Sequence, residues 1–442
     1  MILRLFIFCA FLAAAAPTNI VMIVVDDLGY ADWRTPQIDR LANSGTRYTQ
    51  AYATVPICNA SRIAIMTGCY QQRQGVSWYN GPGLHRADIP TLAEILKSQG
   101  YTTGYIGKYH HGASDRSDKR GFPLNHGFDR FFGFAGGTKH YLHHSAEFAA
   151  GKDMLHEGPM WGQRERRDVE GFSTQLFGDR ARDFISEHRD SPFYLHLSFN
   201  AVHNFVHQLP PSYLADQGLK GFADLADGED YWQWRKNIGY PAHPEGRAYY
   251  LGQLHFLDLE IGRLLDQIEA LGIRERTAIL LVSDNGGSLV TYADNSPLAG
   301  GKYTLFEGGT RVPMIVSCPG RIPEGAVSDL PVSTLDLLPT ACALADAPIP
   351  TNLDGQSLLS PIGPRDLFWD TGHQRAIRRG GWKLLRTRKS PNPRLQITPT
   401  PTGTFLYNLR DDPGETRNLA TAYPHRVAEL SAALKAWNPK PQ

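Results

Sequence analysis

The sequence predicts an α/β fold, in which a doubly wound, mostly parallel sheet is flanked by helices and followed by a small C-terminal antiparallel sheet with one helix. Uniformly apolar runs at residues 19–25 and 277–282 lack polar alternation, which is typical of strands buried on both faces of a parallel sheet. Segments of helical period lie between such runs, as in successive βαβ units. Several strands also end in charged or amide residues, at the edge where open α/β sheets bind ligands.

The expected elements follow in order along the chain. Thr35 and Pro36 predict the start of a first helix, as cap and first-turn proline, and Gly45 predicts its end. The alternation continues with helices at 88–100, 173–188 and 247–271 and with strands at 102–106 and 192–199. On the long helix we expect a solvated acidic face made of Asp258, Glu260 and Asp266.

Length and composition predict that the chain has more than one structural unit. Its 442 residues exceed what one compact core of usual size contains. From about Asp346 several prolines indicate a linker, and strands within 366–385 and 405–409 with a helix at 424–437 fit a small α+β unit. We predict a signal peptide at 1–16, a large catalytic α/β domain at 17–345 and a C-terminal subdomain at 346–442.

The N-terminus has the pattern of a secretory signal. Arg4 supplies positive charge, residues 5–12 are an apolar stretch too short to span a bilayer comfortably, and 13–16 are small cleavage-region alanines. We expect a secreted or periplasmic protein that loses Cys9 with the signal and has no stable membrane insertion; a retained anchor is the alternative. A formal net charge of +1 gives no indication of a nucleic-acid partner.

Polar residues of chemical character end four of the predicted strands: Asp26 with Asp27, Lys108 with His110, His203, and Asp284 with Asn285. A single ending of this kind could be turn chemistry, because Asp is common in turns. Four of them at the ligand-binding edge of one sheet indicate a composite site. Carboxylate and amide oxygens favour a hard cation such as Ca²⁺ or Mg²⁺ over zinc, and the set offers Asp26, Asp27, Asp284 and Asn285.

Residues 56–68 open in a loop and then turn helical, which places Cys58 at or just before a helix N-terminus. That position suits an anion and predicts a lowered thiol pKa. The alternative is an ordinary buried cysteine. Apart from Cys58, three cysteines remain beyond the signal, Cys69, Cys318 and Cys342, and these three allow at most one disulfide among themselves. No cysteine spacing resembles a zinc site.

Cys58-x-Ala60-x-Arg62, followed by a small and apolar helix that ends in Thr67-Gly68, resembles the signature of the type I sulfatases, the formylglycine-dependent, arylsulfatase-like enzymes. The likeness covers nearly the whole mature chain, because other family motifs occur in order. They are Asp26-Asp27, Gly107-Lys108-x-His110, Ala201-x-His203, Ser283-Asp284-Asn285-Gly286, Gly301-Lys302 through Arg311-Val312-Pro313, and Gly381-Trp382-Lys383-Leu384. The resemblance implies an alkaline-phosphatase-like fold and a sulfuric ester hydrolase.

The resemblance also implies a role for each residue. A formylglycine-generating maturation enzyme would oxidise Cys58 to 3-oxoalanine (formylglycine), whose hydrate is the nucleophile. One Ca²⁺ would be bound by Asp26, Asp27, Asp284, Asn285 and the modified Cys58. Arg62 would orient the formylglycine. Lys108 and Lys302 would bind the sulfate group, and His110 and His203 would transfer protons. Most members have proline at the position of Ala60, so the maturation enzyme that acts here is left open.

The secretory signal and several aromatic residues favour a sulfated sugar or polysaccharide, as for bacterial members of the family, over a small aryl ester. Lys139 and His140 lie where relatives place substrate contacts, although His140 could be a structural loop residue. The aromatic segment at 231–235 could stack on sugar rings or form a buried cluster. Two other functions stay open: a phosphate or phosphonate ester hydrolase of the same superfamily, and a secreted glycan-binding protein with an inactive site.

Overall fold

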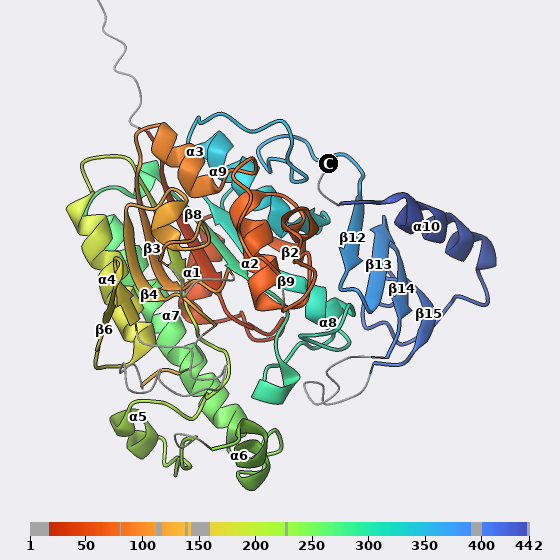
Figure 1. Cartoon of the computed structure of the whole chain (residues 1–442), viewed down its shortest axis with the longest axis horizontal. Coiled ribbons are helices and arrows are strands. Elements are labelled where there is room, and N and C mark those ends of the chain that lie inside the picture. The colour runs from red at the N-terminus through yellow and green to blue at the C-terminus, as the bar shows by residue number, and fades with distance from the viewer. Residues whose placement is uncertain are drawn as a thin grey trace, which may run out of the picture.

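A large mixed sheet and a small antiparallel sheet form the frame of the molecule (Figure 1). The computed structural model describes residues 17–79, 81–111, 117–137, 140–142, 160–225, 229–389 and 400–439. The expected signal peptide at 1–16 lies outside these residues. Within them, no helix combines the length and the apolar character that a membrane crossing requires.

The large sheet has 11 strands and a parallel centre. From edge to edge run β10 (Ala326–Ser328), β2 (Thr46–Tyr52), β9 (Arg311–Ser317), β8 (Thr277–Ser283), β1 (Asn19–Val25), β7 (Phe193–Ser198), β3 (Thr102–Lys108), β4 (Arg130–Phe134), β5 (Met160–Gly162) and β6 (Glu165–Arg167), with β11 (Val332–Ser333) paired to β2. The strands from β8 to β4 all run parallel. β9 runs antiparallel to both β2 and β8. The predicted doubly wound, mostly parallel sheet is confirmed.

Helices cover both faces of this sheet (Figure 1). Successive side chains of a strand point to opposite faces, so β1 contributes to two separate cores. Its odd-numbered residues from 21 to 25 pack in one core with α1 (Pro36–Asn43), α4 (Ser173–Glu187) and α7 (Gly246–Ala270). Its even-numbered residues from 20 to 24 pack in the other with α2 (Cys58–Thr67), α3 (Leu92–Ser98) and α9 (Leu337–Leu344). Burial on both sides explains the uniformly apolar sequence of the strand.

Short helices and unpredicted strands complete the large unit. The short helices are α5 (Pro211–Asp216), α6 (Tyr231–Asn237) and α8 (Glu307–Thr310). The sequence analysis predicts neither β2 nor β4, because their segments contain glycine or polar residues instead of a continuous apolar run. α3 is shorter than the predicted 88–100, since Thr91 forms a capping box with Glu94 and starts the helix there.

The acidic residues of α7 correct one expectation. Asp258 is 7% exposed and Glu260 is 1% exposed, so the expected solvated face is wrong for both. Asp258 accepts hydrogen bonds at 3.0 Å from the backbone N–H groups of Gln37 and Ile38. It thereby caps α1, where the side chain of Thr35 makes no capping bond. Glu260 forms ion pairs with two arginines.

The small sheet has the strand order β12 (Asp366–Asp370), β13 (Gln374–Arg379), β14 (Trp382–Thr387) and β15 (Gly403–Asn408), and every neighbouring pair is antiparallel. One face packs with Tyr52 and Leu305 of the large unit. The opposite face is covered by α10 (Pro424–Ala436), which lies on the far side from the large sheet (Figure 1). The predicted small antiparallel sheet with one helix is confirmed, while the boundary between 345 and 346 stays a prediction.

Candidate active site

The ends of β1 and β8 bring four oxygen-bearing side chains together. The two strands are parallel neighbours whose last residues are in register, so Asp26, Asp27, Asp284 and Asn285 follow at one edge. The backbone N–H of Asp27 donates to Oδ1 of Asp284 at 3.2 Å, and Nδ2 of Asn285 donates to Oδ1 of Asp27 at 2.7 Å. All four side chains are fully buried. The four predicted metal ligands therefore lie in one group.

Helix α2 adds Cys58 and Arg62 to this group. Cys58 is the first residue of α2, after the extended residue Ile57, and Gly68 ends the helix in a left-handed conformation, as predicted. Residues four apart lie on one face of a helix. The thiol Sγ of Cys58 is 3.3 Å from Oδ1 of Asp26, and Nε of Arg62 donates to Oδ2 of Asp284 at 2.8 Å.

Two buried lysines reach the same carboxylates. Lys108 ends β3, and its Nζ forms an ion pair with Oδ2 of Asp26. Lys302 extends its Nζ to three groups: Oδ2 of Asp27 at 2.7 Å, Sγ of Cys58 at 3.0 Å and Nε2 of His203 at 2.9 Å. Neither lysine is more than 5% exposed. We call the assembled residues the strand-end cluster: Asp26, Asp27, Cys58, Arg62, Lys108, His203, Asp284, Asn285 and Lys302.

The charges of the strand-end cluster balance without a ligand. Its three carboxylates face one guanidinium and two ammonium groups. A bound divalent cation would leave the cluster with about two positive charges in a buried setting. Such a site attracts an anion, and a sulfate monoester carries one negative charge.

Several features of the cluster fit a metal ion. Single ligand atoms of Asp26, Asp27, Cys58 and His203 all lie within 4.8 Å of one another. Oδ1 of Asn285 is buried and accepts no hydrogen bond from the described residues. Buried polar atoms are nearly always paired, so an unpaired acceptor beside carboxylates fits a cation partner. The residues present therefore fit the predicted Ca²⁺.

Asp26 is held as a carboxylate by its neighbours. Burial alone would raise the pKa of Asp26. The charges of Lys108, His203 and Arg62 outweigh burial and hold that pKa well below the ordinary value. Asp26 is therefore ionised throughout the physiological pH range and is available as a ligand.

The other two carboxylates lack such compensation. Burial raises the pKa of Asp27, and Lys302 offsets this only in part. Burial likewise raises the pKa of Asp284 to about 7, against the attraction of Arg62. A cation bound between these groups would favour their ionised forms.

The thiol of Cys58 contradicts the expectation of a lowered pKa. Burial, with the charges of Asp26 and Asp284, raises the pKa of Cys58 well above its ordinary value, and Lys302 offsets only part of this. The helix N-terminus is thus outweighed by burial among carboxylates. All four cysteines of the described residues are free and buried, so none of them forms a disulfide.

The remaining predicted residues have varied settings. His110 follows Lys108 by two residues, is half-buried, and lies against Gly137, where an added Cβ would be 2.7 Å from its Nε2. His140 is 2% exposed and stacks on the ring of Phe205 at 4.4 Å between centroids. Lys139 lies outside the described residues.

The aromatic segment at 231–235 takes the buried alternative. Tyr231 and Trp234 are 6% and 2% exposed, and the ring of Trp234 stacks on Phe205 at 5.2 Å. The hydroxyl of Tyr231 accepts a hydrogen bond from the amide of Asn204. These two rings are part of the core and do not form an open platform.

Ser198 is a site residue that the sequence analysis missed. It ends β7, and its Oγ accepts from Arg62 at 2.5 Å and donates to the backbone oxygen of Lys108 at 2.7 Å. Ser198 thus joins α2 to β3 and orients the guanidinium. The signal that could have identified it is its place as the last, polar residue of a buried apolar strand.

Comparison with known proteins agrees with this geometry. The family profile described as Sulfatase matches residues 18–347. Bovine arylsulfatase A (Bos taurus) is 30% identical over 96% of this chain and 87% of its own length. Mouse N-acetylgalactosamine-6-sulfatase (Mus musculus) is 31% identical over 79% of this chain and 67% of its own length.

Solved structures show the same architecture. The crystal structure of Ps i-CgsB in complex with k-i-k-neocarrahexaose superposes with a TM-score of 0.77, at 28% identity over 95% of this chain and 92% of that one. The phosphonate monoester hydrolase of Agrobacterium radiobacter has a TM-score of 0.64 at 19% identity and covers 95% of each chain. At 19% identity, the similarity to the phosphonate monoester hydrolase shows a shared fold alone. On the family profile and the relatives together, the chain belongs to the sulfatase family, a family of sulfuric ester hydrolases.

Proposed function

We propose that this protein hydrolyses sulfate esters on a sulfated carbohydrate and releases inorganic sulfate, with Cys58 in its oxidised formylglycine form and one bound Ca²⁺. The observation that carries the proposal is the position of the Cys58 side chain. Its Sγ lies 3.3 Å from the Asp26 carboxylate and 3.0 Å from the Lys302 ammonium. A nucleophile at this point has metal ligands on one side and a cation for the substrate on the other.

The cation and the modified side chain would supply the reactive chemistry. Bound Ca²⁺ would act as a Lewis acid that stabilises negative charge, and an oxidised residue 58 would supply the attacking oxygen. The proposed Ca²⁺ ligands are Asp26, Asp27, Asp284 and Asn285, together with residue 58.

The buried cations would bind the substrate's sulfate group. Lys108 is the last residue of β3, and Lys302 lies in the loop before α8. Both side chains are buried. Hydrogen-bond donors fixed in a water-poor site stabilise developing charge far better than the same donors in water. Arg62, held by Asp284 and Ser198, would offset negative charge around residue 58 without moving.

Two histidines are proposed for proton transfer. His203 Nε2 lies 2.9 Å from Nζ of Lys302, so either group could deliver a proton to the departing sugar oxygen. His110 sits at the same sheet edge as Lys108 and would accept a proton during release of sulfate. These roles remain proposals, as do substrate contacts by Lys139 and His140.

A carbohydrate is the favoured substrate. Among the relatives at 25% identity or more, the mouse enzyme is named N-acetylgalactosamine-6-sulfatase, and the structure of Ps i-CgsB is a complex with k-i-k-neocarrahexaose. With the expected signal peptide, we infer a secreted or periplasmic enzyme that acts on an external glycan.

Maturation would involve a partner enzyme. Cys58 is 3% exposed and Ala60 is 0% exposed in the folded chain. A formylglycine-generating enzyme would therefore have to reach this segment before folding is complete. Ala60 in place of the usual proline makes the identity of that enzyme an open part of the proposal.

The first test is mass spectrometry of the peptide that contains Cys58, on protein purified from its native host. We expect the mass of the aldehyde or its hydrate. A second assay compares release of sulfate and of phosphate from matched aryl and sugar esters. An unmodified thiol with retained glycan binding would contradict the proposal and favour an inactive binding protein, and faster release of phosphate would favour a phosphate or phosphonate ester hydrolase.

A further inference from the structure

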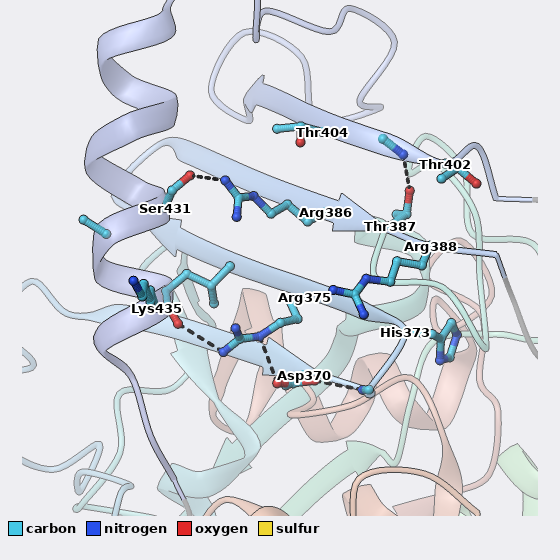
Figure 2. Close-up of a pocket in the computed structure, with 14 residues that line it drawn as sticks. Asp370, His373, Arg375, Arg386, Thr387, Arg388, Thr402, Thr404, Ser431 and Lys435 are labelled. Carbon is cyan, nitrogen blue, oxygen red and sulfur yellow. Dashed lines mark hydrogen bonds and ion pairs between the residues drawn. The ribbon is translucent and has the colours of Figure 1, made fainter.

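A cavity of about 810 Å³ lies on the C-terminal sheet, and no residue of the strand-end cluster lines it. Figure 2 shows its floor on β13 and β14, its wall on the last turns of α10, and His373 at the opposite end. Small-ligand sites commonly measure about 300–1,000 Å³. The cavity is therefore large enough for part of an oligosaccharide.

The floor carries a row of charge across three strands. Asp370, Arg375 and Arg386 are directly opposite one another on β12, β13 and β14. Like charges opposite each other across a sheet are destabilising. Asp370 neutralises Arg375 at 2.9 Å, whereas Arg386 donates only to the hydroxyl of Ser431 at 2.8 Å and meets no carboxylate among the described residues.

Two more cations border the cavity. Arg388 follows β14 and Lys435 lies on α10, and both are exposed. Neither side chain forms a hydrogen bond or ion pair with another described residue. Four cations against one carboxylate give the cavity an excess of three positive charges, whereas the whole chain has a net charge of +1. Such local concentration of charge is the footprint of an anion-binding surface.

Aromatic rings connect the cavity to the strand-end cluster. Nζ of Lys302 lies 5.5 Å from the ring centre of Tyr303, and that ring is 6.2 Å from the ring of Trp78. Trp78 in turn meets His373, a residue of the cavity, at 4.9 Å. Tyr79 beside them is 37% exposed. Of these rings, the exposed Tyr79 and the half-buried Trp78 suit contact with the faces of sugars, whereas Tyr303 is buried.

We propose that this basic cavity binds a second anionic group of the same polyanionic glycan chain whose sulfate ester enters the strand-end cluster. The inference rests on the proposed sulfatase function, and it narrows the substrate to an oligosaccharide or polysaccharide with anionic groups on more than one sugar. Arg386, Arg388 and Lys435 supply the contacts. Arginine suits sulfate and carboxylate groups, because its planar fork donates two parallel hydrogen bonds.

The arrangement favours a glycan over other polyanions. A nucleic-acid site usually extends over a broad basic surface, and the chain as a whole is nearly neutral. The cavity is instead a confined group of four cations joined by aromatic rings to a buried site. The charged floor is on the α10 face of the small sheet, so a chain of sugars would bridge the two positions by passing the turn between β12 and β13, where His373 meets Trp78. Binding at both positions raises the total affinity.

The test uses the full-length protein with Cys58→Ala, which binds without turnover. Sulfated hexasaccharides and disaccharides from heparin, chondroitin sulfate and carrageenan are titrated by calorimetry, and the hexasaccharide that binds best is kept. The pocket variant carries Arg388→Ser and Lys435→Ser, since both residues are exposed and leave no buried partner. The matched control carries Arg189→Ser and Arg417→Ser, two exposed arginines that do not line the cavity.

We expect the pocket variant to lose about tenfold in affinity for the hexasaccharide and nothing for the disaccharide. The same substitutions on the Cys58 enzyme should raise KM for the hexasaccharide and leave kcat, and turnover of an aryl sulfate, unchanged. Equal hexasaccharide affinity in the pocket and control variants would overturn the inference, as would the absence of hexasaccharide binding. An equal loss for a DNA oligonucleotide or an anionic vesicle would overturn the assignment to a glycan. Lack of sulfate release from every sulfated oligosaccharide tested, in a parent enzyme that still binds the hexasaccharide, would instead count against the proposed function.

Discussion

Two groups of buried charge lie at the two ends of one loop, and they differ in how completely protein groups satisfy them. Lys302 at the start of the loop belongs to the strand-end cluster, and Glu307 at its end belongs to a second group that joins the two sheets. We call the second group the sheet-junction cluster. Its members are Tyr52, Glu307, Arg378, Lys383 and Glu415.

Protein partners satisfy the sheet-junction cluster. Nζ of Lys383 lies 2.9 Å from Glu307 and 3.0 Å from Glu415, and Lys383 and Glu307 are fully buried. The second oxygen of Glu307 accepts from the hydroxyl of Tyr52 at 2.6 Å, and Glu415 accepts from the backbone N–H of Glu307 at 2.6 Å. Each carboxylate thus has a cation and a hydrogen-bond donor from the chain itself.

The strand-end cluster is different, because single ligand atoms of Asp26, Asp27, Cys58 and His203 lie within 4.8 Å of one another. Beside these atoms, Oδ1 of Asn285 is buried and has no donor among the described residues. The comparison teaches that buried charge alone does not identify a site. Ligand atoms gathered within reach of one ion, beside an acceptor that no described protein group pairs with, identify a site, whereas charge paired between elements holds those elements together.

The largest effect should follow from a change at the centre of the strand-end cluster. Replacing Cys58 by Ser, in a host without a serine-converting enzyme, should lower sulfate release by at least about 10³-fold, because serine cannot become the aldehyde there. Thermal unfolding should change little. Cys69→Ala, at another buried free cysteine, is the control and should keep its activity. Full activity of the Cys58 variant would remove the formylglycine from the proposal.

A change in the sheet-junction cluster should act on stability instead. Lys383→Met leaves Glu307 and Glu415 buried without their shared cation, which should cost about 3–5 kcal/mol of unfolding free energy. Urea unfolding measures the loss, with Lys389→Met at an exposed lysine as control. Below its unfolding transition, the Lys383 variant should keep a normal kcat. A large loss of kcat at unchanged stability would place Lys383 in the chemistry and erase the contrast.

Calcium should distinguish the two clusters directly. Addition of Ca²⁺ at about 100 times its Kd should stabilise the protein by about 2.7 kcal/mol, because only the folded chain gathers the ligands. The shift is measured by thermal unfolding with and without a chelator, so it needs no turnover. Asn285→Ala should reduce the shift, and Asn237→Ala, at an exposed asparagine, should not. A shift equal in all three proteins would place the ion elsewhere.

The smallest expected effect concerns pH. Burial raises the pKa of Glu415 from its ordinary 4.5 to about 7, although Lys383 opposes this. Between these values the folded state binds more protons than the unfolded state, so stability is greatest below 4.5 and falls as the pH rises towards about 7. Glu415→Gln should remove on the order of 2 kcal/mol of this decrease. Urea unfolding at several pH values measures it, and identical pH dependence in both proteins would contradict the assignment.

Local sequence signals accounted for much of the fold. The apolar runs of β1 and β8 identified strands buried on both faces, and their polar endings identified the edge where the site lies. Strand β2 gave no such signal, because it carries polar residues such as Thr46 and Arg47, which are buried through contacts with distant segments and residues before the strand. Asp258 was misjudged for a related reason, since its partners on α1 are over 200 residues away in sequence.

By itself the sequence determined the fold class, the family and most residues of the strand-end cluster, because strand burial, helix ends and catalytic motifs are written in neighbouring residues. Only the tertiary structure decided the protonation tendencies of Cys58 and Asp284, the place of Ser198 and the basic cavity on the small sheet. The physical reason is that desolvation and Coulomb interactions depend on distances between segments that the chain brings together only when it folds.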